Sequence, residues 1–296
     1  MIDLITIVFQ QELYLLELQA RSIELYVDSD RINNIYVVVN DVDDVVDLID
    51  TAWWGVNFQK VVVIPRSRWG HVETLPGWES QQLFKLLAAE SAASDWSMCL
   101  DAKTWFVKQL DWDQLFSHDG RAHYKSIPTI NVFESAQRTI EQLLSVSLST
   151  VIGPGGVPFM FHTETVKDMF VHLKNITGTN FIDFFAEYAL IPYQVTEFML
   201  YSGFVNLKHK SHNALYSQQQ YYTVTNMADW QLGEFDKIIK SMNSTNNLTA
   251  SIQGRAYPHL TDSQLDTWCN FLLNKNLIND PQEAKNKLNI LRYPLS

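Results

Sequence analysis

The stretch WSMCLDAKTWF, residues 96–106, carries a short apolar strand into a charged turn. Asp101 ends the apolar run, and Lys103 follows two positions later before the chain becomes apolar again. A carboxylate at the end of a buried strand is costly unless it has a partner or a function. In an extended segment Asp101 and Lys103 share one face, while Ala102 points away. This pair is the first candidate site, and a plain strand-end salt bridge is the alternative.

Four short apolar runs, bounded by polar or proline residues, predict strands. They are residues 4–9, 34–40, 60–65 and 96–101. Helices are predicted between them, at residues 11–27, 42–50 and 77–92. Apolar strands without polar alternation are typical of a parallel sheet that is covered on both faces. The order of strands and helices therefore predicts an α/β fold with a mostly parallel central sheet flanked by helices.

The rhythm of the chain changes after Asp101. The elements predicted there are a helix near 134–148, a Gly/Pro-rich loop at 151–161, a helix capped by Thr163 with Glu164, an apolar segment at 180–206, a β-like segment at 248–257 and a helix at 263–278 capped by Thr261 or Asp262. No internal repeat is visible. The pattern predicts a single domain with a mixed C-terminal half.

Composition excludes several classes of protein. A chain of 296 residues with 46% hydrophobic residues has enough apolar surface for a folded core. Its formal net charge of −11 argues against a protein that wraps nucleic acid. Cys99 and Cys269 fit neither a disulfide framework nor a zinc knuckle, which favours a reducing compartment. No basic leader and no apolar run of about 18 residues is present, so we expect a cytoplasmic protein without a transmembrane segment.

Polar side chains follow all four predicted strands. They are Gln10 after the first strand, Asn40 and Asp41 after the second, Arg66 and Arg68 after the third, and Asp101 after the fourth. Ligands of open α/β sheets bind at the carboxyl ends of the strands, so these residues are candidates for one ligand site. The alternative is that each strand simply ends in a polar loop.

The predicted helix at 77–92 adds amides and a cation. Gln81, Gln82 and Lys85 lie within about one turn, and Gln81 and Lys85 share a face because they are four residues apart. We expect Lys85 to lie in the same crevice as Asp101 and not in solvent. An exposed polar face is the alternative.

Common cofactor and hydrolase motifs are absent from the sequence. It contains no G-x-x-x-x-G-K-[ST], no G-x-G-x-x-G, no G-x-S-x-G and no H-E-x-x-H. His209 and His212 have a spacing that would let them share a metal, but surface histidines are the more common case. No metal site is predicted from them.

The order of these pieces resembles the GT-A-type nucleotide-diphospho-sugar transferases. It resembles more closely a bacterial and phage glycosyltransferase-like domain family of unknown function, with LDxK in place of the Asp-x-Asp motif. The segments that carry the resemblance are ITIVF (5–9), GWESQQLFKL (77–86), LDAKTWF (100–106), VPFMFHTETV (157–166) and TEFMLYSGF (196–204). The resemblance implies a GT-A-like core at residues 1–215, with a donor half at about 1–110 and an acceptor half at about 111–215. Residues 216–296 would be an extension packed on this core.

The resemblance implies a glycosyltransferase that moves a sugar from a nucleoside diphosphate sugar to a glycan or another hydroxyl acceptor. The acceptor would lie over the loop at 153–161 and the segment around Glu197. Glu197 would be the general base, with Glu164 and Asp168 as weaker candidates; alternatively, Thr196 and Glu197 merely cap a helix. The substrate-binding residues would be Gln10, Asn40, Arg66, Gln82, Lys85, Asp101, Lys103 and Thr196.

Lys103 is where this chain departs from GT-A enzymes, which usually have a second acid at that position to hold a divalent metal. Two carboxylates and a divalent cation sum to zero charge, and so do Asp101 and Lys103. The sequence therefore predicts that no cofactor is required, with Mn²⁺ or Mg²⁺ held by Asp101 as the alternative. Two further classes stay open: a non-catalytic relative that binds sugar nucleotides or glycans, and a structural or assembly protein.

Overall fold

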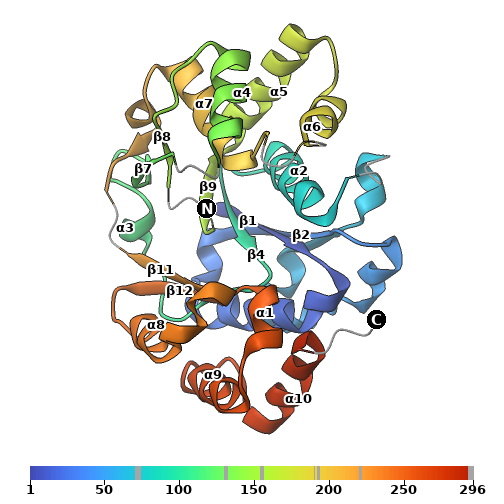
Figure 1. Cartoon of the computed structure of the whole chain (residues 1–296), viewed down its shortest axis with the longest axis vertical. Helices are drawn as coiled ribbons and strands as arrows, with labels where there is room; N and C mark the ends of the chain where they lie inside the picture. The colour runs from blue at the N-terminus through green and yellow to red at the C-terminus, as the bar shows by residue number, and fades with distance from the viewer. Residues whose placement is uncertain are drawn as a thin grey trace.

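A computed structural model of the chain describes residues 1–70, 75–129, 133–153, 157–189, 191, 194–219 and 222–292. Figure 1 shows a central sheet, with α5, α6 and α7 at one end of the molecule and α8, α9 and α10 at the other. The bounds of these helices are Thr163–Thr177, Phe181–Ala189, Glu197–His209, Phe235–Met242, Asp262–Asn274 and Pro281–Arg292.

The main sheet has five strands in the order β3-β2-β1-β4-β9. Their bounds are Ile2–Val8 for β1, Ile32–Val39 for β2, Val61–Ile64 for β3, Trp96–Asp101 for β4 and Phe159–His162 for β9. The first four are parallel, and β9 is antiparallel to β4. All seven residues of β1 are buried, as expected for a strand covered on both faces. The predicted α/β class with a mostly parallel central sheet is confirmed.

The helices predicted in the first hundred residues form, with changes at their ends. The segment 11–27 divides into the 3-10 turn η1 (Gln10–Glu12) and the helix α1 (Leu13–Tyr26). The helix predicted at 77–92 is α2 (Gly77–Glu90). The remaining connections are 3-10 helices: η2 (Ser29–Arg31), η3 (Asp43–Leu48), η4 (Thr51–Lys60) and η5 (Arg66–Trp69).

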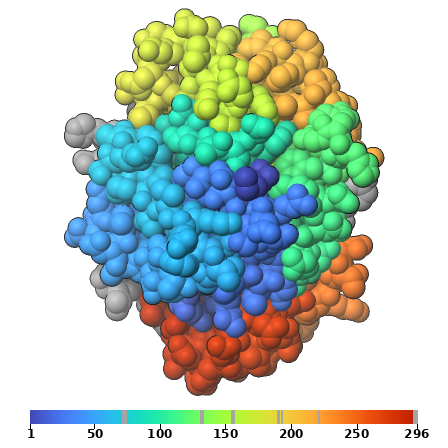
Figure 2. All heavy atoms as spheres, turned by 180° about the vertical axis from the view of Figure 1, so that it is seen from behind, coloured from blue at the N-terminus to red at the C-terminus, as the bar shows by residue number. Residues whose placement is uncertain are grey.

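A second sheet joins distant parts of the chain in the order β11-β12-β5. Strands β11 (Thr223–Met227) and β12 (Asn247–Ile252) are parallel, and β5 (Thr104–Phe106) is antiparallel to β12. A second hydrophobic cluster packs Leu15, Leu18 and Trp105 with apolar residues beyond position 226. Figure 2 shows the C-terminal helices (red) packed against the N-terminal part (blue). The division at 215/216 stays a prediction, but sheet pairing and packing both cross it.

Two short pairs of strands complete the β-structure of the described ranges. They are β6 (Ala122–His123) with β10 (Tyr216–Ser217), and β7 (Ser126–Pro128) with β8 (Thr150–Ile152). The other helical elements are α3 (Trp112–Leu115), α4 (Glu134–Leu144), η7 (His212–Ala214), η8 (Asp229–Glu234) and η9 (Gly254–His259). No helix of the described ranges is long and apolar enough to cross a membrane.

Two cap predictions have different outcomes. Thr261 precedes α9 and its side chain accepts a hydrogen bond from the Gln264 amide, so the helix cap predicted at Thr261 or Asp262 is confirmed at Thr261. The cap predicted at Thr163 is wrong, because Thr163 is the first residue of α5 and its hydroxyl donates to the Ser94 carbonyl. Ser94 lies in the connection between α2 and β4, so the hydroxyl bonds to a distant segment instead of capping the helix.

Candidate active site

The strand order reverses between β1 and β4, because the chain leaves β1 towards β2 and β3 and then returns to β4 on its other side. Open α/β sheets bind their ligands at such a point, outside the carboxyl ends of the strands. Asp101, the last residue of β4, is paired in register with Ile7 near the end of β1. The sheet thus places Asp101 at the position where a ligand site is expected.

Gln19 holds the turn that carries Asp101 and Lys103. Its side chain is fully buried on α1, and its Nε2 donates to the carbonyl oxygens of Asp101 (2.6 Å) and Thr104 (2.9 Å). Its Oε1 accepts a hydrogen bond of 2.7 Å from the Thr6 hydroxyl. A buried amide with all of these partners fixes both ends of the turn, since each lost bond would leave a buried polar group unsatisfied.

Lys85 lies between two carboxylates. Its Nζ is 3.1 Å from Asp101 Oδ1 and 3.1 Å from Glu197 Oε1, and the lysine is 5% exposed. Burial disfavours the charged amine, but Asp101 and Glu197 outweigh it and raise the pKa of Lys85 above its ordinary value. Gln81 also contacts this group, because its Nε2 lies 3.3 Å from Asp101 Oδ1. Lys85 therefore joins the end of β4 to the start of α7.

Lys103 lies on the other side of Asp101, nearer to solvent. Its Nζ is 3.6 Å from Asp101 Oδ2 and 3.8 Å from Glu12 Oε1, and its side chain is 19% exposed. Burial lowers the pKa of Lys103, but Asp101 and Glu12 outweigh this effect and raise it. Glu12 Oε2 is buried without a hydrogen-bond partner in the described structure, and burial raises the pKa of this carboxyl. We call Glu12, Lys85, Asp101, Lys103 and Glu197 the charge cluster.

The carboxylates of the cluster have opposite pKa shifts. Burial would raise the pKa of Asp101, but Lys85 and Lys103 overcome it and lower that pKa to about 2. At Glu197 burial dominates over the attraction of Lys85, so its pKa is raised. Asp101 is therefore held ionised, whereas the ionised form of Glu197 is disfavoured by its surroundings.

The start of α7 does not show the expected cap. Thr196 occupies the N-cap position, but its side chain makes no capping hydrogen bond. Glu197 is the first residue of α7 and is 5% exposed, with its carboxylate on Lys85. The loop at 153–161, predicted with the segment of Glu197 to face the acceptor, lies partly outside the described ranges.

Asn40 and Arg66 lie together at the ends of β2 and β3, where they contact other parts of the protein. Asn40 is buried; its Nδ2 donates to the Gly77 carbonyl at 3.0 Å, and its Oδ1 accepts from the Ser80 hydroxyl at 2.9 Å and from Arg66 Nη1 at 3.3 Å. These bonds hold the first turn of α2 over the sheet. The structure thus gives both residues a role in positioning α2.

The other predicted residues are more scattered. Gln10 is exposed, and its backbone N–H donates to Asp41 Oδ2 at 2.6 Å. Gln82 is buried on α2 with its Nε2 3.5 Å from the Trp78 carbonyl oxygen, so Gln81 is the amide that reaches Asp101. His212 is not a surface residue: it is buried, and its Nε2 lies 3.0 Å from the Ser202 carbonyl oxygen.

Residues 7–245 match the model of a family described as a family of unknown function, DUF6492. The chain belongs to this family. The match covers most of the chain, including the five members of the charge cluster. Among curated proteins no sequence matches this DUF6492 chain.

The fold of the DUF6492 chain is that of a GT-A glycosyltransferase. It is similar to a crystal structure of the galactosyltransferase LgtC in complex with donor and acceptor sugar analogs, with a TM-score of 0.51 and 12% identity over 97% of this chain and 100% of that chain. A second LgtC structure, of an active-site mutant, gives a TM-score of 0.49 and 13% identity with the same coverage. The first likeness shows the fold.

The residues at the turn do not fit a divalent metal. Asp101 directs one carboxylate oxygen to each lysine, and the nearest other carboxylate, Glu12, also faces the Lys103 ammonium. No three His, Cys, Asp or Glu side chains in the described part of the DUF6492 chain gather as metal ligands. A dication at Asp101 would stand beside two ammonium groups, which is electrostatically unfavourable.

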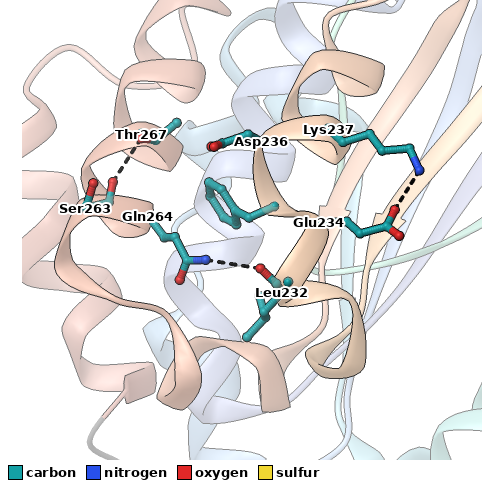
Figure 3. Close-up of a pocket in the computed structure, with 9 residues that line it drawn as sticks. Leu232, Glu234, Asp236, Lys237, Ser263, Gln264 and Thr267 are labelled. Atoms are coloured by element: carbon teal, nitrogen blue, oxygen red, sulfur yellow. Dashed lines mark hydrogen bonds and ion pairs between the residues drawn. The ribbon is translucent and has the colours of Figure 1, made fainter.

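Two cavities lie elsewhere on the DUF6492 chain. One, of about 550 Å³, is lined by residues of η8, α8 and α9, including Glu234, Lys237 and Gln264 (Figure 3). The other, of about 360 Å³, lies between α1, η4 and the segment leading into α10. Neither is lined by a member of the charge cluster. We place the candidate site at the cluster because charged groups converge there at the reversal of strand order.

Proposed function

We propose that this chain is a glycosyltransferase that moves a sugar from a nucleoside diphosphate sugar to a glycan or another hydroxyl acceptor. The observation that carries the proposal is the position of Lys103, beside Asp101 at the reversal of strand order in a GT-A fold. An ammonium there can donate three hydrogen bonds to phosphate oxygens.

Lys103 is the group that stabilises the leaving diphosphate. Charge develops on that diphosphate as the bond to the sugar breaks, and a fixed cation placed next to it lowers the barrier. Lys103 is part-exposed and its two carboxylate contacts are 3.6 and 3.8 Å long, so its ammonium can turn towards a phosphate. Lys85 does not take this role because it is enclosed by Asp101 and Glu197. It holds Asp101 in place.

Glu197 is our candidate for the general base that takes the proton of the acceptor hydroxyl. Its raised pKa suits a group that must bind a proton near neutral pH. Glu197 is buried against Lys85, which argues against this role. Glu12 is the competing candidate, because it lies beside Lys103 and has an oxygen without a hydrogen-bond partner in the described structure. Glu197→Gln and Glu12→Gln form a matched pair. The variant that removes the base should transfer sugar roughly 10²–10⁴-fold more slowly than the wild type, and the other variant should keep most of the rate.

The test of the function is a screen with and without chelator. Uridine and guanosine diphosphates are first assayed by thermal shift, where a ligand at 100 times its Kd raises the stability of the native state by about 2.7 kcal/mol. Sugar nucleotides carrying the base that binds are then assayed for hydrolysis and transfer. We expect turnover that persists in chelator and is impaired by Lys103→Ala. Failure of both diphosphates to bind would contradict the proposal and favour a structural protein.

A non-catalytic sugar-nucleotide-binding relative is the second candidate. The observation that favours it is the engagement of all three carboxylates of the cluster by lysines. Diphosphate binding without hydrolysis of any sugar nucleotide would identify this case. Loss of wild-type turnover in chelator, recovered with Mn²⁺, would instead show that Asp101 is a metal ligand.

A further inference from the structure

An exposed tryptophan lies at the carboxyl end of the second sheet. Trp230 follows β11 directly in η8, and it is 69% exposed. The guanidinium of Arg255 lies over its ring, with Cζ 4.9 Å from the ring centroid. Arg255 Nε is also 3.1 Å from Asp229 Oδ1 and 3.1 Å from Gln253 Oε1. The indole is thus framed by a cation and a carboxylate and still faces solvent.

The segment that contacts this tryptophan also passes the charge cluster. Thr104, which follows Lys103, is paired in register with Ser251 on β12, so the chain that leaves β12 passes the turn at 101–104. A Cβ at Gly254 would lie 4.0 Å from Glu12 Oε1, and that oxygen is 3.8 Å from Lys103 Nζ. Arg255 is the next residue after Gly254, and it reaches Trp230. The segment after β12 thus passes Glu12 at Gly254 and contacts the indole through the next residue, Arg255.

We propose that Trp230, with Asp229 and Arg255, is a platform that binds the pyranose ring of a glycosyl acceptor. This inference rests on the proposed function. A pyranose presents an apolar C–H face, which packs on an indole, and a rim of hydroxyls, which bind carboxylate and guanidinium groups. Asp229 and Arg255 supply both kinds of partner, with the guanidinium over the indole ring and the carboxylate beside the guanidinium.

The position of the platform favours a sugar over the base of the donor. The two parallel strands β2 and β3 continue the main sheet beyond β1, whereas β12 and β11 lie on the side of β5. Nucleosides of such folds bind over the parallel strands near the reversal of strand order. Trp230 follows β11, the edge strand of the second sheet, so it lies outside the parallel strands of the main sheet that a nucleoside would occupy.

The test measures saccharide binding without a donor. Methyl glycosides of glucose, galactose, mannose and N-acetylglucosamine, together with lactose and cellobiose, are titrated by saturation-transfer NMR. We expect at least one to bind, with a Kd raised about tenfold in Trp230→Ala and much less in Trp230→Phe. Phe58→Ala is the control, because Phe58 is 49% exposed on η4, outside the platform. Unchanged melting temperatures would show that the three variants fold.

The outcomes separate this inference from the function. The protein could bind a saccharide through Trp230 and yet turn over no sugar nucleotide. That result would support the platform and contradict the proposed glycosyltransferase function. The wild type could instead transfer sugar while Trp230→Ala has the same KM for the acceptor. That result would support the glycosyltransferase function and overturn the platform. Binding of no saccharide in the panel, equal losses in Trp230→Ala and Phe58→Ala, or weakened binding of uridine or guanosine diphosphate alone would also overturn it.

Discussion

Lys85 and Lys103 both contact Asp101, but their surroundings are opposite. Lys85 is enclosed, with two contacts of 3.1 Å, whereas Lys103 lies nearer solvent with contacts of 3.6 and 3.8 Å. A buried ion with close partners is costly to separate from them, while an ion at the rim exchanges partners at little cost. The same type of residue is thus a fixed brace on one side of Asp101 and an available cation on the other.

The largest effect is expected from Lys85→Met. It leaves Glu197 buried without its cation and Asp101 with the more distant Lys103 alone, which should lower the free energy of unfolding by about 3–5 kcal/mol. Urea unfolding followed by circular dichroism measures this loss. In the double variant with Glu197→Gln part of the loss should be recovered, because the unpaired charge of Glu197 is removed. A loss in the free energy of unfolding below about 1 kcal/mol, typical of surface ion pairs, would show that Lys85 and Lys103 do not differ as described.

The second effect concerns Gln19, which holds the turn that carries Asp101 and Lys103. Gln19→Leu removes the donor to two carbonyl oxygens of the turn, one buried and one part-buried, and we expect a loss of about 2 kcal/mol or more in the free energy of unfolding. Thr6→Val is the matched control, because it removes only the bond to Gln19 Oε1 and leaves both turn contacts in place. It should cost clearly less. Equal losses in the two variants would show that the turn does not depend on Gln19.

A third effect appears in the dependence of stability on pH. The pKa of Asp101 is lowered to about 2 in the fold, so its contribution is present above the unfolded value and is lost as the pH falls towards 2. With an unfolded pKa near 3.8, the contribution is about 2 kcal/mol. Asp101→Asn should flatten the acid limb of a plot of unfolding free energy against pH.

Glu197 should act with the opposite sign. Its folded pKa is raised, so the stability linked to its protonated form is present below the unfolded pKa and is lost as the pH rises through the folded value. Glu197→Gln should therefore remove a decline in stability above pH 4.5, the ordinary value, and leave the acid limb steep. Parallel curves for Asp101→Asn and Glu197→Gln would contradict the opposite shifts.

The smallest effect on stability is expected from Lys103→Met. Its side chain is part-exposed and its contacts are long, so the loss should be at most about 1 kcal/mol. Diphosphate binding should weaken nonetheless, as measured by thermal shift. Lys237→Met is the control for a surface ion pair, because Lys237 contacts Glu234 and neither residue is a member of the cluster. A large loss of stability with intact diphosphate binding would reverse the roles of the two lysines.

The sequence predicted the part of the site that depends on local geometry. Alternation along an extended segment put Asp101 and Lys103 on one face, and their side chains do lie 3.6 Å apart. Helical spacing put Gln81 and Lys85 on one face, and both contact Asp101. The four strands near the N-terminus were found because apolar runs between helices are typical of a buried parallel sheet.

The sequence did not reveal contacts between distant segments. Gln19 was overlooked because it stands among apolar residues of α1, and only its place on the buried face, four residues after Leu15 and four before Ile23, distinguishes it. The pairing of β5 with β12 joins residues more than 140 positions apart, and no periodicity reports such a contact. Lys85 and Glu197 are 112 positions apart, so their ion pair was equally hidden.

The pairing of β5 with β12 also determines the order in which parts of the fold can form during translation. The turn at 101–104 leaves the ribosome early, together with β1 and β4, but its flank is open until residues 247–252 have been translated and have reached it. Contacts of such long separation form late, because the intervening chain must be ordered first. During synthesis the edge of β5 is bare, and a nascent chain stalled before β12 would present that edge to chaperones or to other unfinished chains.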